Sequence, residues 1–239
     1  MADQEIYWID NRSDNSTDAE ISFRVAGKVP ELWNAVTGKT EKIAFQIVAG
    51  RTIVPLHLES WDAQFIVFKD KASQNSLVIK PKSSQEILTI STPWKVVMNN
   101  QNLNFDKLTS WSESTDANVK YFSGTASYSN SFKISKIDKS STYNIDLGEV
   151  KNIAEVFVNG KNVGVAWKKP FSLDLSEALK IGDNSIEIKV TNLWVNRLIG
   201  DAQPETTNKT TFTTMPFYQP NSPLLPSGLM GPVKLISSK

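Results

Sequence analysis

The sequence contains no cysteine and only one histidine, His57, among its 239 residues. Without cysteine there are no disulfide bonds, no thiolate metal sites and no cysteine-based catalysis, although the cellular compartment stays undetermined. His57 lies between two leucines in an alternating segment, and neither a Gly-x-Ser-x-Gly nor a His-Glu-x-x-His motif accompanies it. A structural role is therefore favoured for this histidine over a catalytic one.

The chain also has little net charge and no long apolar run. It carries 26 basic and 25 acidic residues, and the basic residues are scattered, so neither nucleic acid nor an anionic membrane is expected as a partner. No apolar run approaches the roughly 20 residues of a membrane-spanning helix. Residues 1–5 are mostly polar and acidic and lack an apolar signal segment, which suggests an internal fragment or a trimmed chain.

Period-two alternation is what the sequence does contain, and it is clearest between residues 153 and 192. Residues 153–158 alternate small apolar side chains with other types, and Asn159-Gly160 supplies the positive φ angles of a tight hairpin turn. Residues 161–166 return as the partner strand, in which Gly164 allows a bulge. Residues 182–190 alternate again after a turn. Short antiparallel strands with turns between them predict a sandwich or jelly roll.

The pattern divides the chain into two all-β units. Residues 1–90 show short alternating segments, and none of their windows of 12 or more residues has a helical period. A Lys-, Ser- and Gln-rich stretch at 80–86 precedes Ser91-Thr92-Pro93-Trp94, where a new pattern begins. We therefore predict an antiparallel β-sandwich-like domain at 1–90 and a jelly roll at 91–239, both within an all-β fold class.

Catalysis by this chain alone is not favoured. Glycoside hydrolysis needs two carboxylates at a defined separation, and the candidates are Asp146, Glu155, Asp174, Glu187 and Asp201. Several of them occupy turn or outward strand positions that have ordinary structural explanations. Calcium could bind through carboxylates and carbonyls, but no Asp-x-Asp-x-Asp loop supports a site. No phosphate-binding loop occurs either, so no cofactor is expected.

Seven tryptophans invite a sugar-binding interpretation, because aromatic rings pack on the apolar faces of sugars. Core or inter-domain packing is the simpler interpretation for four of them, Trp8, Trp33, Trp61 and Trp94. Trp167 follows a strand at a corner, and Trp194 follows another strand among Asn192, Asn196 and Arg197. For these two, core packing and a ligand or domain contact both remain open.

The order of motifs in the second unit resembles a known sugar-binding fold. The galactose-binding-like jelly roll of family 2 glycoside hydrolases has a similar order, which reads here Ala154-x-Val156-x-Val158-Asn159-Gly160, Gly164-x-x-Trp167-x-x-Pro170-Phe171 and Gly182-x-Asn184. Two further runs look more like the C-terminal end of glycoside hydrolase family 106, the α-L-rhamnosidases. They are Asn192-Leu-Trp-Val-Asn-Arg-Leu-Ile-Gly-Asp201 and Leu224-Leu-Pro-Ser-Gly-Leu-Met-Gly-Pro-Val233, and Pro30-Glu-Leu-Trp-Asn34 fits the same family.

The resemblance implies a non-catalytic accessory region of an α-L-rhamnosidase-like enzyme. In that family the catalytic acid and base belong to a barrel domain, and this sequence has no alternating strand–helix units that could form one. The resemblance further implies pectin-type plant glycans as substrates and a periplasmic or secreted setting. Alternatives are a free-standing carbohydrate-binding module, a domain that only contacts protein, and a small glycosidase in its own right.

The run that begins at Asn192 supplies the candidate site. We predict a carbohydrate-binding or domain-contact surface formed by Trp167, Asn192, Trp194, Asn196, Arg197 and Asp201. Arg197 offers a planar fork of donors, for which Asp201 is a suitable bidentate partner. This pair could simply pin a loop to its own domain. Alternatively, the segment and the Thr-rich loop at 204–218 could face a glycan or a catalytic barrel.

Overall fold

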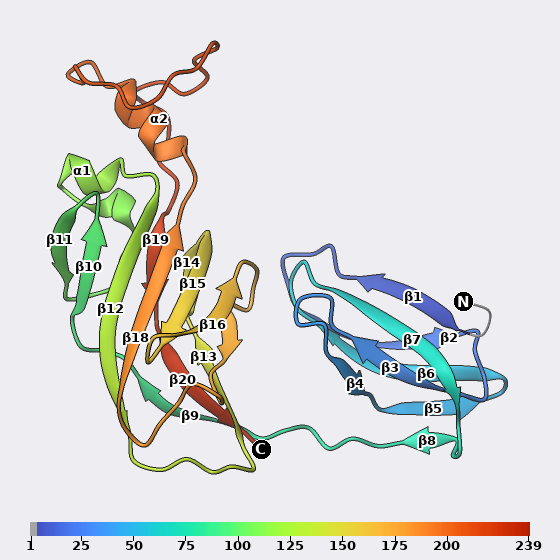
Figure 1. Ribbon diagram of the computed structural model, residues 1–239. Helices are drawn as coiled ribbons and strands as arrows, with labels where there is room; N and C mark the ends of the chain where they lie inside the picture. Colours follow the sequence, from blue (N-terminus) through green and yellow to red (C-terminus); the bar gives the residue numbers. More distant parts are fainter. Residues whose placement is uncertain (1–3) are drawn as a thin grey trace. The chain divides into compact units, whose positions relative to one another are not determined.

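The computed structural model describes residues 4–239, which form two compact units, Met1–Pro81 and Lys82–Lys239 (Figure 1). Residues 1–3, part of the acidic stretch without a signal segment, lie outside the described residues. Within residues 4–239, no helix reaches the length and apolar character that a membrane crossing requires.

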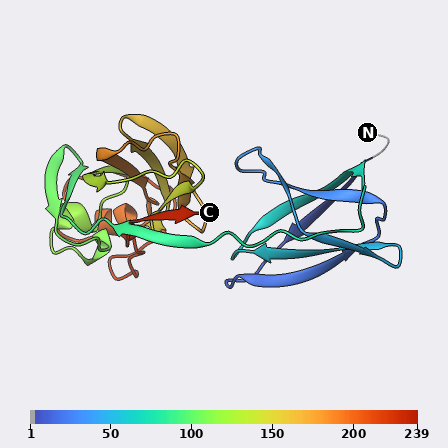
Figure 2. The same cartoon turned by 90° about the horizontal axis from the view of Figure 1, so that it is seen from below.

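The first unit is a sandwich of two four-stranded antiparallel sheets, ordered β1-β7-β3-β4 and β2-β6-β5-β8 (Figures 1 and 2). The strands are β1 (Glu5–Asp10), β2 (Thr17–Phe23), β3 (Lys28–Trp33), β4 (Thr40–Lys42), β5 (Phe45–Val48), β6 (Arg51–Leu58), β7 (Ala63–Lys71) and β8 (Ser76–Leu77).

The core of the first unit is aromatic. Tyr7, Phe23 and Phe68 converge from three strands, with ring centroids 4.8 to 5.9 Å apart. Such tilted and edge-on contacts add stability beyond the burial of the rings. We expected Trp8 and Trp61 to be core or inter-domain residues; neither lies in a core, because both rings are exposed. In β1 it is Tyr7 that turns inward, since alternate side chains of a strand point to opposite faces.

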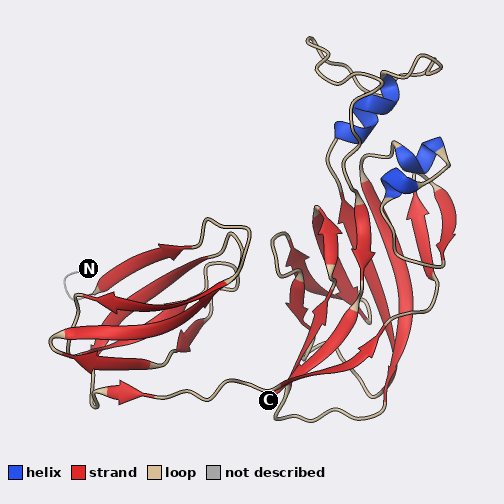
Figure 3. Cartoon of the chain, turned by 180° about the vertical axis from the view of Figure 1, so that it is seen from behind, coloured by secondary structure: helices blue, strands red, loops and turns tan. Residues whose placement is uncertain are grey.

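The second unit contains a six-stranded sheet, β11-β10-β12-β18-β15-β16, a four-stranded sheet, β17-β13-β20-β9, and the two-stranded pair β14-β19 (Figure 3). The strands are β9 (Ser84–Thr89), β10 (Trp94–Met98), β11 (Gln101–Phe105), β12 (Thr125–Ile134), β13 (Thr142–Asp146), β14 (Glu149–Lys151), β15 (Ile153–Val158), β16 (Lys161–Ala166), β17 (Ser172–Asp174), β18 (Gly182–Thr191), β19 (Gly228–Gly231) and β20 (Lys234–Ser238). The helices are a 3₁₀ turn at Trp111–Glu113, α1 (Ala117–Lys120) and α2 (Val195–Asp201).

The boundary between the units differs from the predicted one. Residues 82–90, which the sequence pattern assigned to the first unit, belong to the second. The reason is strand pairing: β9 forms an antiparallel pair with β20 near the C-terminus. Ser83 and Lys239 extend this pairing with two backbone hydrogen bonds of 2.9 and 3.0 Å.

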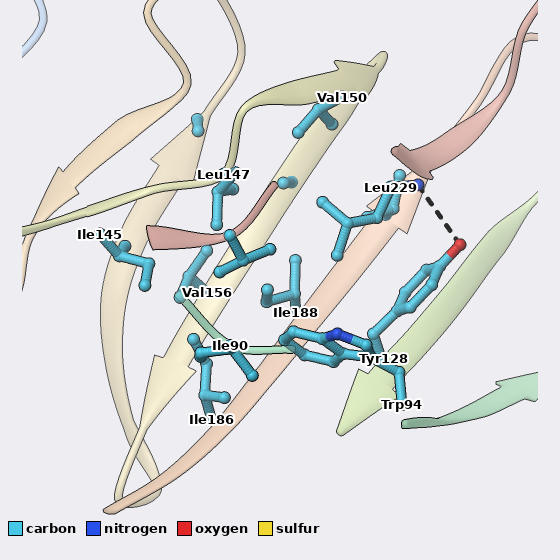
Figure 4. Close-up of a cluster of buried hydrophobic side chains, with 14 of the residues drawn as sticks. Ile90, Trp94, Tyr128, Ile145, Leu147, Val150, Val156, Ile186, Ile188 and Leu229 are labelled. Atoms are coloured by element: carbon cyan, nitrogen blue, oxygen red, sulfur yellow. Dashed lines mark hydrogen bonds between the residues drawn. The ribbon is translucent and has the colours of Figure 1, made fainter. Parts of the chain in front are cut away.

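The core of the second unit lies between its sheets, and β18 is its central strand. Pairing with β12 involves all ten residues of β18, and β15 pairs along its other edge. The predicted alternation is confirmed, because Ile186, Ile188 and Val190 are buried. Figure 4 shows Ile186 and Ile188 among the core side chains. Val156 is also fully buried and lies directly opposite Ile188 in the β15–β18 register.

The predicted hairpin between β15 and β16 is confirmed as well. Asn159 and Gly160 have φ angles of 52° and 79°, the positive values that a two-residue turn of this type requires. A register irregularity beside Val156 shows the bulge expected near Gly164, whose φ is 129°. A short 3₁₀ turn at Trp111–Glu113 is capped by Ser110, whose side chain accepts from the backbone N of Ser112.

Ile188→Ala should therefore lower the free energy of unfolding by about 2–5 kcal/mol, since it leaves a cavity in a closely packed core. Lys189→Ala is the matched control on the opposite face, where the ammonium lies 4.5 Å from the centroid of the Phe157 ring. Loss of that contact should cost less than about 1 kcal/mol. Urea unfolding of the two variants checks the register, and equal losses would show that it is wrong.

Candidate functional site

The candidate residues gather at one end of the six-stranded sheet because of the strand register. Val190 of β18 lies opposite Ala154 of β15, which in turn lies opposite Ala166 of β16. Trp167 follows Ala166 directly, and Trp194 follows shortly after the end of β18. Both tryptophans therefore leave the sheet at the same end, two strand positions apart. Each ring is exposed rather than packed in the core.

The segment after β18 is a short helix, which the sequence pattern did not predict. Seven residues, Val195–Asp201, form α2 at the end of the second unit (Figure 1). Trp194 occupies the position before the helix, has helical backbone angles and makes no side-chain capping bond. The segment thus leaves the sheet as a helix.

Asn192 and Asn196 use their amides inside the domain. The Asn192 side chain accepts from Gly124 N at 2.9 Å and donates to Phe122 O at 2.8 Å. Asn196 accepts from the backbone N of Leu225 at 2.9 Å and donates to its carbonyl oxygen at 2.8 Å. Each amide thus holds a distant segment of the chain beside α2, much as a backbone strand pair would.

Arg197 and Asp201 form an ion pair within α2. Arg197 Nη2 lies 2.7 Å from Asp201 Oδ1, in one contact rather than the predicted bidentate fork. The cation lies in the first turn of the helix and the anion at its C-terminal end, so both charges oppose the helix dipole. An arginine placed N-terminal to its acidic partner is also the less favourable order for an i, i+4 pair. Helix stability alone therefore does not explain these charges.

Asp201 instead organises the segment that follows it. Its Oδ2 accepts three hydrogen bonds, from the backbone N of Thr210 at 2.9 Å, and from the N and Oγ1 of Thr211, both at 2.7 Å. Burial acts to raise the pKa of Asp201, but these bonds and the Arg197 charge outweigh burial, so the pKa is lowered. The carboxylate is thus held ionised at the base of residues 202–224, which we call the arm.

Further hydrogen bonds tie the arm to α2. Thr206 Oγ1 donates to Gly200 O at 2.8 Å. Gln203 Nε2 donates to Ile199 O at 3.2 Å and to Pro220 O at 2.9 Å, which joins the two ends of the arm. The arm contains no regular element and spreads out beyond α2 (Figures 1 and 3). Its folded-back path therefore depends on side-chain bonds rather than on a strand pairing.

The arm presents apolar side chains to solvent. Phe212 is 88% exposed, and Met215 and Phe217 are each 80% exposed. The arm and α2 also enclose a hollow of about 360 Å³, whose lining includes Leu198, Phe212 and Tyr218. The Thr-rich character of this loop is conspicuous in the sequence, whereas these apolar residues were not predicted to be exposed. Their spacing in an otherwise polar run was the available signal.

No metal site is evident: within residues 4–239, no group of three or more His, Asp or Glu side chains is placed to hold an ion. His57 lies in the first unit, with Nδ1 2.7 Å from Asp18 Oδ1 and Nε2 3.4 Å from Glu59 Oε1. The hydrogen bond to Asp18 is the main cause that raises the pKa of His57. This exposed cluster gives the histidine a structural explanation.

Comparisons with known proteins relate this β-sandwich region to glycoside hydrolases. Comparison with known proteins confirms the resemblance to family 106: the alpha-L-rhamnosidase family model matches residues 1–47. The solved structure of a rhamnosidase from Novosphingobium sp. PP1Y matches 99% of this chain with a TM-score of 0.94 and 40% sequence identity. The chain is thus similar to a rhamnosidase over almost its whole length.

Two curated proteins of Formosa agariphila are also similar. One, named "Putative beta-glucuronidase", is 42% identical over 156 residues, and the other, named "Beta-glucuronidase", is 32% identical over 119 residues. These matches cover 55% and 47% of this chain but only 13% and 12% of the relatives. The chain likewise spans 23% of the Novosphingobium rhamnosidase chain. It therefore corresponds to a minor part of each of these proteins.

Asp201→Asn should loosen the arm. The neutral amide loses the attraction to Arg197, and its NH₂ group cannot accept the hydrogen bonds that Asp201 receives from Thr210 and Thr211 or face the Arg197 guanidinium favourably. Amide hydrogen exchange at Thr210 and Thr211 should become faster, while Asp183→Asn, which changes an exposed residue at the start of β18, should leave it unchanged. In the unchanged protein, protection should be complete above the unfolded aspartate pKa of about 3.9 and should be lost as the pH falls through the lower folded value. Unaltered exchange in Asp201→Asn would contradict this role.

Proposed function

We propose that this chain is a non-catalytic accessory region of a larger α-L-rhamnosidase-like glycoside hydrolase, in which the arm docks on the catalytic domain. The observation that carries the proposal is the arm itself. Asp201 holds an irregular segment in place, and that segment exposes Phe212, Met215 and Phe217. Soluble proteins rarely leave such apolar side chains clustered in solvent without a partner.

The energetics of burial support docking. Covering a large apolar side chain is worth about 1.5–3 kcal/mol, so the three side chains together would contribute a substantial part of an inter-domain contact. The partner we propose is a catalytic barrel of the same polypeptide. Support for this partner comes from the rhamnosidase match, which leaves 77% of that chain outside the matched 23%.

The resemblance to family 106 supports the remaining parts of the proposal. The substrates would be pectin-type plant glycans that carry α-L-rhamnose, and the enzyme would work in the periplasm or outside the cell. Hydrolysis itself would be carried out by carboxylates of the barrel. On this hypothesis Arg197 and Asp201 affect activity indirectly, by holding the arm, rather than by contacting the glycan.

The isolated 239-residue chain should therefore show no turnover of an aryl α-L-rhamnoside. In the enzyme that contains this region, the combined variant Phe212→Ser, Met215→Ser and Phe217→Ser should lower kcat/KM by at least about tenfold, which corresponds to about 1.4 kcal/mol. The thermal stability of the separately expressed chain should change little, since these side chains are exposed in it. Steady-state kinetics and thermal unfolding measure the two quantities.

Val78→Ser is the matched control, because Val78 is 85% exposed and lies far from the arm in the sequence. Arg197→Ala in the same enzyme should also reduce kcat/KM about tenfold, by releasing the arm. Full activity in the combined variant would contradict docking through the arm. Turnover by the isolated chain would instead favour the alternative of a small glycosidase.

A further inference from the structure

A second hollow lies at the base of α2, on residues that the arm does not use. Its volume is about 230 Å³. It lies among the turn between β14 and β15, the start of α2 and the segment that precedes β19. The lining consists of Lys151, Asn152, Asn192, Leu193, Val195, Asn196, Leu225, Pro226 and Ser227. The hollow under the arm has none of these residues in its lining.

The lining combines apolar and polar side chains. Leu193, Val195, Leu225 and Pro226 supply apolar surface, while Lys151 is its only charged residue. A surface of this kind suits a ligand that has an apolar face and hydroxyl groups at its rim. Ligand pockets of drug-sized molecules are about 300–1,000 Å³, so this smaller hollow suits a single ring rather than a chain.

Asn152 offers polar groups that the protein itself does not use. Its backbone N donates to Thr191 O at 2.9 Å, which fixes the residue beside β18. Its side-chain amide, by contrast, makes no hydrogen bond to any part of the chain that the structure describes. A carboxamide carries two donor hydrogens and an acceptor oxygen. Asn152 is therefore able to bond two neighbouring hydroxyl groups at once.

Lys151 adds a second group. Its ammonium lies 3.0 Å from Glu149 Oε1, but both side chains are partly exposed, so this pair contributes little and can be rearranged by a ligand. The two other asparagines of the lining are already bonded to backbone, and they hold the walls in position. Binding would thus require little reordering of the protein, which favours affinity.

We propose that this hollow binds one pyranose ring of a glycan, with the C–H face of the ring against Leu193 and Leu225 and its hydroxyls bonded to Asn152 and Lys151. The site would let the region hold a sugar unit of a substrate while another unit is hydrolysed elsewhere. It is independent of the arm, so this site and docking through the arm can each fail without the other.

The test is an NMR titration of the full 239-residue chain with methyl α-L-rhamnopyranoside, and separately with methyl β-D-glucuronide. Saturable shifts of the Asn152 side-chain amide are expected with at least one glycoside, and none with glycerol, which has hydroxyls but no ring. A stronger response to the glucuronide would show that Lys151 binds the carboxylate. An equal response would show that ring hydroxyls suffice. Both outcomes support a pyranose site.

Asn152→Ala should weaken binding about fivefold to tenfold, as expected for loss of one or two hydrogen bonds. Leu193→Ser, at an exposed position of the apolar wall, should also weaken binding. If Asn152→Ala does not fold, the affinity of this second variant tests the proposal. Asn102→Ala, an exposed strand asparagine of the same unit, is the control and should bind normally. The proposal is overturned if neither glycoside gives saturable shifts, or if both site variants retain full affinity.

Discussion

The pairing of β18 with both of its neighbours determines where every candidate residue lies. Its ten residues pair with β12, and its second half also pairs with β15. A register shift of one residue would move Ile186, Ile188 and Val190 out of the core, so burial holds the register strongly. Because α2 follows β18 closely, the same register positions α2, the base of the arm and the hollow at Asn152.

Charges in α2 are arranged for the arm rather than for the helix. Arg197 and Asp201 oppose the helix dipole, yet Asp201 accepts three hydrogen bonds from residues nine and ten positions later. One ionised carboxylate therefore replaces the strand pairing that an irregular segment lacks. These bonds fix Thr210 and Thr211, which directly precede the exposed Phe212.

The strands could be predicted well from the sequence, because a strand that is buried on one face alternates apolar and polar side chains. The strands around the Asn159-Gly160 hairpin and the alternation in β18 both show this pattern. Helix α2 has only seven residues, too few for a helical period to be distinguished from other patterns. The boundary at 82–90 was misplaced because β9 pairs with β20, some 150 residues away, and such pairing has no local signal.

The candidate site shows a different limit. Asn192, Asn196, Arg197 and Asp201 have the polar groups of a sugar site, and sequence alone cannot show that most of these groups bond to the chain itself. The groups that the chain itself leaves unused are the apolar side chains of the arm and the Asn152 amide beside the second hollow, and our two proposals rest on these groups. Asn152 could not be singled out from the sequence, because its side-chain amide differs from those of other asparagines only in making no hydrogen bond to the part of the chain that the structure describes. The polar residues that are conspicuous in the sequence thus hold the chain in position. The residues that we propose as contacts for a sugar or a second domain are their neighbours.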